Sequence, residues 1–314
     1  MSILISVIIC THNRAELINT ALQSLCEQSL AFNEYEVIVV DNNSTDHTRS
    51  VVEKFASKYT NIRYCLETKI GLSNARNRGW REAQGEYVAY TDDDCKLPSQ
   101  WLSVAKEIIE QRSYVLFGGP FFPFYDSPKP FWFRDSYRSR GFGDDARFLT
   151  QREDLIGNNI FIRRSLLEKL GGFNTYLGMS GKQIAYGEET ELQMRVRETM
   201  PELGIFYESR LYVYHLVRAE RMKIGWLIRE FFAKGRYVYL TAHGNDTPAL
   251  GRLSLLMRAL KVALEMLTDI SYGALIRNRA KYPYFQNYFY EHSSRYLRGW
   301  GRLYAQYTRL GKNS

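Results

Sequence analysis

The sequence has no run of 18 or more uninterrupted apolar residues, so it predicts no membrane-spanning helix. The first ten residues are apolar but follow no basic segment, and they predict a buried strand rather than a signal peptide. Only four cysteines are present, all in the first third of the chain and none in a C-x-x-C pair. This scarcity argues against a disulfide framework and against a zinc site, and it favours reduced thiols in a cytoplasmic protein.

The composition is that of a folded globular protein, with 45% hydrophobic and 24% charged residues in a chain of 314. This length allows one large α/β domain with an appendage, or two modest domains. We expect a main domain over residues 1–220, with halves of about 1–117 and 118–220, followed by a helical region over 221–314.

Positive charge is concentrated at the C-terminal end. Residues 251–314 contain eleven Lys or Arg and three acids, which accounts for the whole net charge of +8. Eleven aromatic residues are interleaved with these charges. A basic and aromatic helical region suits the surface of an anionic membrane, here the inner face of the plasma membrane. It also suits a helical subdomain whose aromatics form a core or a homodimer interface. Nucleic acid is not expected, because no binding motif accompanies the charge.

Strand and helix patterns alternate through the first hundred residues. Helices are predicted over 15–30, from a cap at Thr45 or Asp46 to 59, over 72–84 before Gly85, and onward from Pro98. Strands are predicted at 3–10, 35–40, 61–66 and 87–91. Further on, 158–163 and 204–207 predict strands, 189–198 predicts a helix, and 118–156 is irregular. The alternation predicts the α/β class, a mostly parallel sheet with helices on both faces.

Three of the first four strands end in polar or acidic loops, at residues 11–14, 41–44 and 92–94. Ligands bind at the carboxyl ends of strands in such sheets, so we expect these loops to form one site. The carboxylates of Asp92, Asp93 and Asp94 repel one another unless a cation lies among them, and Mg²⁺ or Mn²⁺ prefers such oxygen ligands. A solvated acidic turn is the alternative.

Several stretches, in this order, resemble the family 2 glycosyltransferases. They are residues 6–14 (SVIICTHNR), 37–46 (VIVVDNNSTD), 71–79 (GLSNARNRG), 85–94 (GEYVAYTDDD), 157–159 (GNN), 171–173 (GGF) and 187–192 (GEETEL). Together they cover roughly residues 3–240. The resemblance implies a GT-A fold and inverting transfer from a nucleotide sugar, with a UDP-sugar favoured over a dTDP-sugar. The implied acceptor is a glycan or a lipid-linked saccharide.

The resemblance also implies a nucleotide site. Thr11 matches a residue near the base and Arg14 one near the phosphates, while Asp41 matches the acid that accepts from the base ring. Asp41 is alternatively a turn residue, and Arg76 an exposed helical charge. His12 either stacks on the base or is exposed. The residues assigned to this site are Thr11, His12, Asn13, Arg14, Asp41, Asn43, Arg76, Asp92 and Asp93.

Asp92 and Asp94 match the outer members of the family's D-x-D motif, with Asp92 toward the ribose and metal and Asp94 on the metal. His215 follows a strand-like segment and either completes the metal shell or serves a structural role.

Glu188 and Glu189 stand where the family usually has Glu-Asp, the second acid being the general base for the acceptor hydroxyl. Glu189 is therefore expected as the base and Glu188 as a residue that holds the acceptor. Either acid could instead pair with Arg195 or Arg197 across the helix.

Residues 223–236 lack the Gln-x-x-Arg-Trp signature of processive synthases, which favours addition of a single sugar. A sugar-phosphate nucleotidyltransferase is the runner-up, but residues 11–14 lack the glycine-rich loop it needs. A non-catalytic nucleotide-sugar-binding protein would not be expected to keep acids at both sites.

Overall fold

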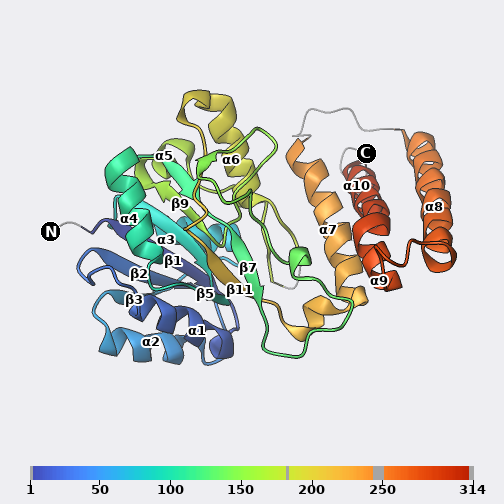
Figure 1. Cartoon of the computed structure of the whole chain (residues 1–314). Coiled ribbons are helices and arrows are strands. Elements are labelled where there is room, and N and C mark those ends of the chain that lie inside the picture. Colours follow the sequence, from blue (N-terminus) through green and yellow to red (C-terminus); the bar gives the residue numbers. More distant parts are fainter. Residues whose placement is uncertain (1–2, 182–183, 243–250, 311–314) are drawn as a thin grey trace. The chain divides into compact units, whose positions relative to one another are not determined.

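The computed structural model describes residues 3–181, 184–242 and 251–310, and it is shown in Figure 1. The described residues form two compact units. The first contains 3–124, 135–181 and 188–216, and the second contains 125–134, 184–187, 217–242 and 251–310.

An eight-stranded sheet lies at the centre of the first unit. Its first four strands are parallel, and β9 then pairs antiparallel with β4. The order across the sheet is β3 (Ile62–Leu66), β2 (Tyr35–Asp41), β1 (Ile5–Thr11), β4 (Tyr87–Asp92), β9 (Ile160–Arg163), β6 (Leu116–Gly118), β10 (Phe206–Tyr207) and β8 (Arg147–Phe148). A second, three-stranded sheet has the order β5 (Cys95–Lys96), β11 (Val213–Leu216) and β7 (Phe121–Phe124).

Helices cover both faces of the large sheet because the side chains of its strands point alternately to opposite sides. Val7 and Ile9 of β1 belong to one buried cluster and Ile8 to another. The first cluster includes α1 (Ala15–Cys26), α2 (Thr48–Lys58) and α4 (Trp101–Arg112). The second includes α3 (Leu72–Glu82), α5 (Arg164–Leu170) and α6 (Glu188–Thr199). Strands buried on both faces explain the near-continuous apolar runs in the sequence.

The predicted α/β fold is confirmed, with differences at element ends. Helix α1 ends at Cys26 rather than at residue 30, and α3 ends at Glu82, before Gly85. Helix α2 begins at Thr48, whose backbone N–H donates to the Asp46 carboxylate at 3.0 Å. Residues 118–156 are not wholly irregular, because β7 and β8 lie within them. These short strands were missed since they consist of four and two residues.

Gly119, between β6 and β7, lies against backbone. A Cβ atom there would come within 1.9 Å of the carbonyl oxygen of Leu211. Gly119→Ala is therefore expected to lower the free energy of unfolding by about 3 kcal/mol or more, since backbone cannot rotate away as a side chain can. Thermal unfolding measures this. Gly225→Ala is the control, because Gly225 lies in a helix with no atom within 4 Å of the added methyl group. Equal Tm values for the two variants would contradict the prediction.

The second unit is helical. It contains η3 (Ala219–Met222), α7 (Ile224–Ala242), α8 (Arg252–Leu275), α9 (Phe285–Tyr288), the π-helical turn η4 (Phe289–Ser293) and α10 (Ser294–Leu310). Helices α7 and α10 approach closely, since a Cβ on Gly235 would lie 1.9 Å from the Arg298 carbonyl oxygen. Tyr288 and Phe289 are buried, so part of the aromatic content forms a core. Among the described helices none is long and apolar enough to cross a membrane.

Candidate active site

The carboxyl ends of three parallel strands meet at one edge of the large sheet. Thr11 pairs in register with Asp41, and Cys10 with Asp92. The predicted convergence of the three loops is therefore present. Asn13 joins the first two loops, because its side-chain oxygen accepts from the Thr45 backbone N–H at 2.7 Å. Its own φ of 53° is left-handed, a conformation that asparagine tolerates.

Asp41 is buried at the end of β2. Its carboxylate accepts from the backbone N–H of Ser44 at 2.8 Å and from the hydroxyl of Tyr64 at 2.9 Å. The turn-forming role that the sequence left open is thus present, and the carboxylate is fixed in place by it. Asn43, next to it, is exposed with a φ of 61°. Thr11 is buried, and the half-buried ring of His12 contacts the Asn42 carbonyl oxygen through Nδ1 at 2.8 Å.

Asn42 is a residue that the sequence analysis missed. Its side-chain amide donates to the carbonyl oxygens of Glu67 and Lys69, at 3.1 and 2.9 Å. Its side-chain oxygen accepts from the Gly71 backbone N–H at 2.7 Å. Asn42 therefore fixes the loop that leads into α3. The sequence feature that could have indicated this role is its position within the Asp41–Ser44 loop.

The second sheet brings His215 to the acidic triplet. His215 lies within β11 rather than after it, and it pairs antiparallel with Cys95 of β5. Its Nε2 atom lies 3.0 Å from Asp94 Oδ1 and 3.5 Å from Asp92 Oδ2. One ligand atom from each of Asp92, Asp94, Cys95 and His215 lies within 4.8 Å of the others. Two carboxylates with an imidazole fit Mn²⁺ or Mg²⁺, with the oxygen atoms as the preferred ligands.

Asp93 is held by Arg14. It is buried and accepts from the Arg14 guanidinium at 2.6 Å, and the same Nη1 atom lies 3.4 Å from Asp94 Oδ2. Burial raises the pKa of Asp93 to about 6, although the charge of Arg14 acts in the opposite direction. Arg14 therefore offsets part of the negative charge that gathers at the end of β4.

Glu188 and Glu189 begin α6, where the helix dipole favours negative charge. Arg76 of α3 lies beside them, with its Nη1 atom 2.6 Å from Glu188 Oε1 and 3.8 Å from Glu189 Oε2. The alternatives given for these groups were wrong. Arg76 is not exposed but 4% accessible, and neither glutamate pairs across its own helix.

The two arginines proposed as partners are used elsewhere. Arg195 binds Glu191 at 2.8 Å, and Arg197 binds Asp154 at 2.6 Å. Sequence reasoning missed the Arg76–Glu188 pair because the two residues are 112 positions apart.

Arg76 is held tightly in its place. Its guanidinium lies over the rings of Tyr90 and Phe173, at 5.8 and 5.4 Å from the ring centroids. A Cβ on Gly157 would come within 2.3 Å of its Nη2 atom, so only glycine fits there. The Gly-Asn-Asn stretch noted in the sequence therefore supplies the space that this buried cation needs.

Arg76 also connects the two acidic sites. Burial acts to lower the pKa of its guanidinium, but the charges of Glu188, Glu189 and Asp92 all act to raise it. The thiol of Cys10 lies among the same groups, and burial raises its pKa to about 12. The candidate metal ligands and the glutamate pair are thus parts of one charged cluster.

The sequence profile described as glycosyl transferase family 2 matches residues 6–171, which is more than half of the chain. The chain belongs to glycosyl transferase family 2. It is therefore a glycosyltransferase, and the resemblance noted in its motifs is confirmed.

Similar proteins agree with this membership. The glucosyl-dolichyl phosphate glucuronosyltransferase of Haloferax volcanii is 26% identical over 240 residues, which cover 74% of this chain and 75% of that protein. A mannosyltransferase of Pyrobaculum calidifontis, solved with GDP-mannose and Mn²⁺, has a TM-score of 0.59 at 19% identity. The match covers 98% of this chain and 86% of the mannosyltransferase chain.

TarS of S. aureus, solved with UDP-GlcNAc, has a TM-score of 0.57 at 19% identity. The match covers 99% of this chain and 91% of the TarS chain in that structure. Both solved structures share the fold of this chain, which is the predicted GT-A architecture with C-terminal helices.

The glutamate pair of this family 2 enzyme gives a pH prediction. Burial and the Glu189 carboxylate raise the pKa of Glu188 from 4.5 to about 8, while Arg76 acts to lower it. Because the folded-state pKa is raised, the stability from protonated Glu188 is present below pH 4.5 and is lost as the pH approaches about 8. Wild-type Tm should therefore fall through this window.

Glu188→Gln should remove that dependence. The difference between the Tm of the variant and the Tm of wild type is expected to increase, in favour of the variant, by about 3 °C or more from roughly pH 5 to pH 8. Glu191→Gln, in the same helical turn, is the control, since Glu191 pairs with Arg195 and is not fully buried. Parallel Tm profiles for wild type and Glu188→Gln would contradict the prediction.

Proposed function

We propose that this enzyme is an inverting, metal-dependent glycosyltransferase that adds one sugar from a UDP- or dTDP-sugar to a lipid-linked saccharide or glycan. The observation on which the proposal depends is the single charged cluster at the strand ends. In it, Arg76 lies 3.8 Å from Glu189, the candidate base, and the charge of Asp92, a candidate metal ligand, acts to raise the pKa of the same guanidinium. Inverting transfer needs these two functions close together, because the acceptor attacks the carbon that the diphosphate leaves.

Asp92, Asp94 and His215 would hold Mn²⁺ or Mg²⁺. Such an ion, when bound, neutralises charge that develops on a departing diphosphate. The solved mannosyltransferase with Mn²⁺ supports this part of the proposal by similarity of fold. Arg14 lies at the same end of β4, with its guanidinium 3.4 Å from Asp94 Oδ2. We assign it to the donor phosphates, with Asp93 holding its guanidinium in position.

Thr11, His12, Asn13, Asp41 and Asn43 are proposed to form the nucleotide pocket. The buried Asp41 carboxylate is fixed by Ser44 and Tyr64, which suits a group that accepts from a base ring nitrogen. The complex of TarS with UDP-GlcNAc is consistent with a uridine nucleotide, whereas the mannosyltransferase was solved with GDP-mannose.

Glu189 is proposed to take the proton from the acceptor hydroxyl. It is 15% exposed, whereas the Glu188 side chain is 5% exposed, so Glu189 is the more accessible of the two carboxylates. The Arg76 guanidinium lies 2.6 Å from Glu188 Oε1 and 3.8 Å from Glu189 Oε2, so Glu189 is the less tightly held of the two and the better placed to meet an acceptor.

A lipid-linked acceptor is supported by the similarity to a glucosyl-dolichyl phosphate glucuronosyltransferase. We propose that the enzyme works in the cytoplasm at the inner face of the plasma membrane. Residues 1–220 would form the transferase domain, with a donor half over about 1–117 and an acceptor half over 118–220. Residues 221–314 would contact the membrane or a second copy of the chain, and 243–250 and 311–314 of these lie outside the described residues.

The donor is tested with thermal-shift measurements over UDP-, dTDP- and GDP-sugars, with and without Mn²⁺. A ligand at 100 times its Kd adds about 2.7 kcal/mol of stability, so the correct nucleotide should raise Tm by several degrees. We expect this shift with a uridine or thymidine donor and only with the metal. A shift with GDP-sugars alone would overturn the donor assignment, and a shift independent of the metal would overturn the metal requirement.

A further inference from the structure

Helix α8 has two apolar faces, only one of which is covered. Its inward face includes Leu255 and Gly273, both buried, with Val262 and Met266 half-buried between them. Tyr288 of the adjacent segment packs there, since a Cβ on Gly273 would come within 2.2 Å of its ring. Met266 also packs against the cluster of Leu227, Phe231, Phe289 and Leu297. This face accounts for the position of α8 within the second unit.

The opposite face is a stripe of large exposed apolar side chains, which we call the outer stripe of α8. Its members recur at spacings of three, four or seven positions, or at sums of these spacings. Residues spaced in this way lie along one side of a helix. Each is more than half exposed: Leu253 70%, Leu256 56%, Met257 58%, Leu260 63%, Leu264 65%, Leu267 64% and Leu275 78%. A contiguous apolar surface of this length indicates a binding partner rather than scattered surface leucines.

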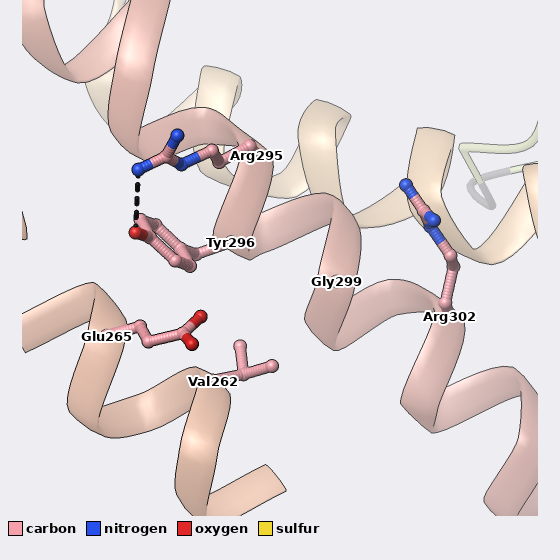
Figure 2. A pocket seen from close by; sticks show the side chains of 6 residues that line it. All are labelled: Val262, Glu265, Arg295, Tyr296, Gly299 and Arg302. Atoms are coloured by element: carbon pink, nitrogen blue, oxygen red, sulfur yellow. Dashed lines mark hydrogen bonds between the residues drawn. The ribbon is translucent and has the colours of Figure 1, made fainter. Parts of the chain in front are cut away.

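Cations flank this stripe. Arg252, Arg258 and Lys261 are exposed on α8 itself, and residues 251–314 contain the whole positive excess of the protein. Further arginines border a pocket between α8 and α10, which is also lined by Glu265, the ion-pair partner of Lys261 at 3.9 Å. Figure 2 shows this pocket, with Val262 and Glu265 on one helix and Arg295, Tyr296, Gly299 and Arg302 on the other.

The charge pattern favours an anionic bilayer over a second copy of this chain as the partner of the outer stripe. A second copy of this chain would bring the same cations toward one another, whereas an anionic bilayer complements them. Helix α8 is 24 residues long, about 36 Å, which is long enough to cross a membrane. Its charged and polar residues, however, make it less apolar than a membrane-spanning helix. An apolar stripe between cationic flanks is the arrangement of a helix that lies in the plane of the membrane surface.

We propose that the outer stripe of α8 inserts into the surface of an anionic lipid bilayer and holds the enzyme there, with the flanking arginines and lysines at the level of the lipid head groups. The proposal deepens the proposed membrane location and names its docking element. It rests on the proposed function in one respect only, which is that docking at the bilayer would give the enzyme access to a lipid-linked acceptor.

Vesicle flotation of the full chain tests this proposal, using phosphatidylcholine vesicles with and without phosphatidylglycerol. Wild-type protein should float with the anionic vesicles and be released in part by high salt. The triple variant Leu256→Gln/Leu260→Gln/Leu264→Gln should bind at least about tenfold less, since three large apolar groups no longer leave water. Glutamine keeps helix propensity, so circular dichroism and Tm should match wild type.

The matched control replaces three exposed apolar residues of α7, as Ile228→Gln/Val238→Gln/Leu240→Gln, and should float like wild type. Arg258→Gln/Lys261→Gln should retain binding to the apolar surface but lose most of the preference for phosphatidylglycerol. Absence of wild-type binding, or equal binding by the α8 triple variant, would overturn the proposal. So would a solution dimer that this variant converts to a monomer, because a second copy would then cover the stripe.

Donor hydrolysis in the absence of vesicles separates this proposal from the proposed function. The α8 triple variant should hydrolyse the nucleotide sugar at the wild-type rate. Normal vesicle binding by a protein that neither binds nor hydrolyses any nucleotide sugar would refute the proposed function and leave the docking surface intact.

Discussion

Replacing Asp94 with asparagine is expected to lower sugar transfer by about 10³-fold, the size of effect seen when one preorganised charge-stabilising group is removed. Asp94 is buried and its Oδ1 lies 3.0 Å from His215 Nε2, so its carboxylate is fixed at the centre of the proposed metal site. Asparagine keeps the shape but not the charge. Chelation with EDTA should have an effect of similar size on wild type, and added Mn²⁺ should restore activity to wild type but not to the variant.

Nucleotide release in the presence of acceptor measures this loss. Asp145→Asn is the control, since Asp145 is an exposed loop aspartate and its replacement should leave the rate unchanged. Thermal unfolding must be measured alongside the assay. Arg14 lies 3.4 Å from Asp94, and in the variant the guanidinium loses one of the negative charges that compensate it. Full activity of folded Asp94→Asn, or of wild type in EDTA, would remove the metal from the mechanism.

Glu189→Gln is expected to lower acceptor-dependent transfer by about 10²–10⁴-fold, the usual contribution of a general base. The donor should bind as tightly as it does to wild type, because Glu189 is assigned to the acceptor side. Glu189→Asp should retain more activity than Glu189→Gln. It keeps a carboxylate, and aspartate is the residue usual at this position in the family.

The design separates loss of a base from loss of structure. Glu191→Gln removes a charge from the same helical turn, where Glu191 pairs with Arg195, and should leave transfer near the wild-type rate. A thermal-shift titration with the nucleotide sugar checks that donor binding is intact. Equal transfer by Glu189→Gln and wild type would assign the base elsewhere, and equal losses in donor binding and in transfer would make Glu189 a donor-site residue.

Much of the fold could be predicted from local patterns. The alternation of apolar runs with helical periodicity located β1 to β4 and α1 to α4 within a few residues, because strands buried on both faces leave a strong local signal. Short strands such as β8, with two residues, leave no such signal and depend on their neighbours for hydrogen bonds. The register of strand ends, with Thr11 beside Asp41, followed from the parallel sheet itself.

The charged cluster could be predicted only in part. Asp92, Asp94 and His215 were grouped correctly as neighbours, which the pairing of β5 with β11 explains. The position of Arg76 was not predicted, because an arginine among polar residues on a helix looks solvent-exposed. Its burial depends on Glu188, which is remote in sequence, on the rings of Tyr90 and Phe173, and on space left by Gly157.

The sequence by itself determined the family, the α/β architecture and the acids placed at strand ends, because each of these follows from residue type and short-range order. Only the tertiary structure decided which charges meet. A buried contact such as that between Arg76 and Glu188 forms where two distant elements exclude water together, and no local pattern encodes that proximity. The same holds for α8, whose two apolar faces look alike in sequence until packing covers one of them and leaves the other exposed.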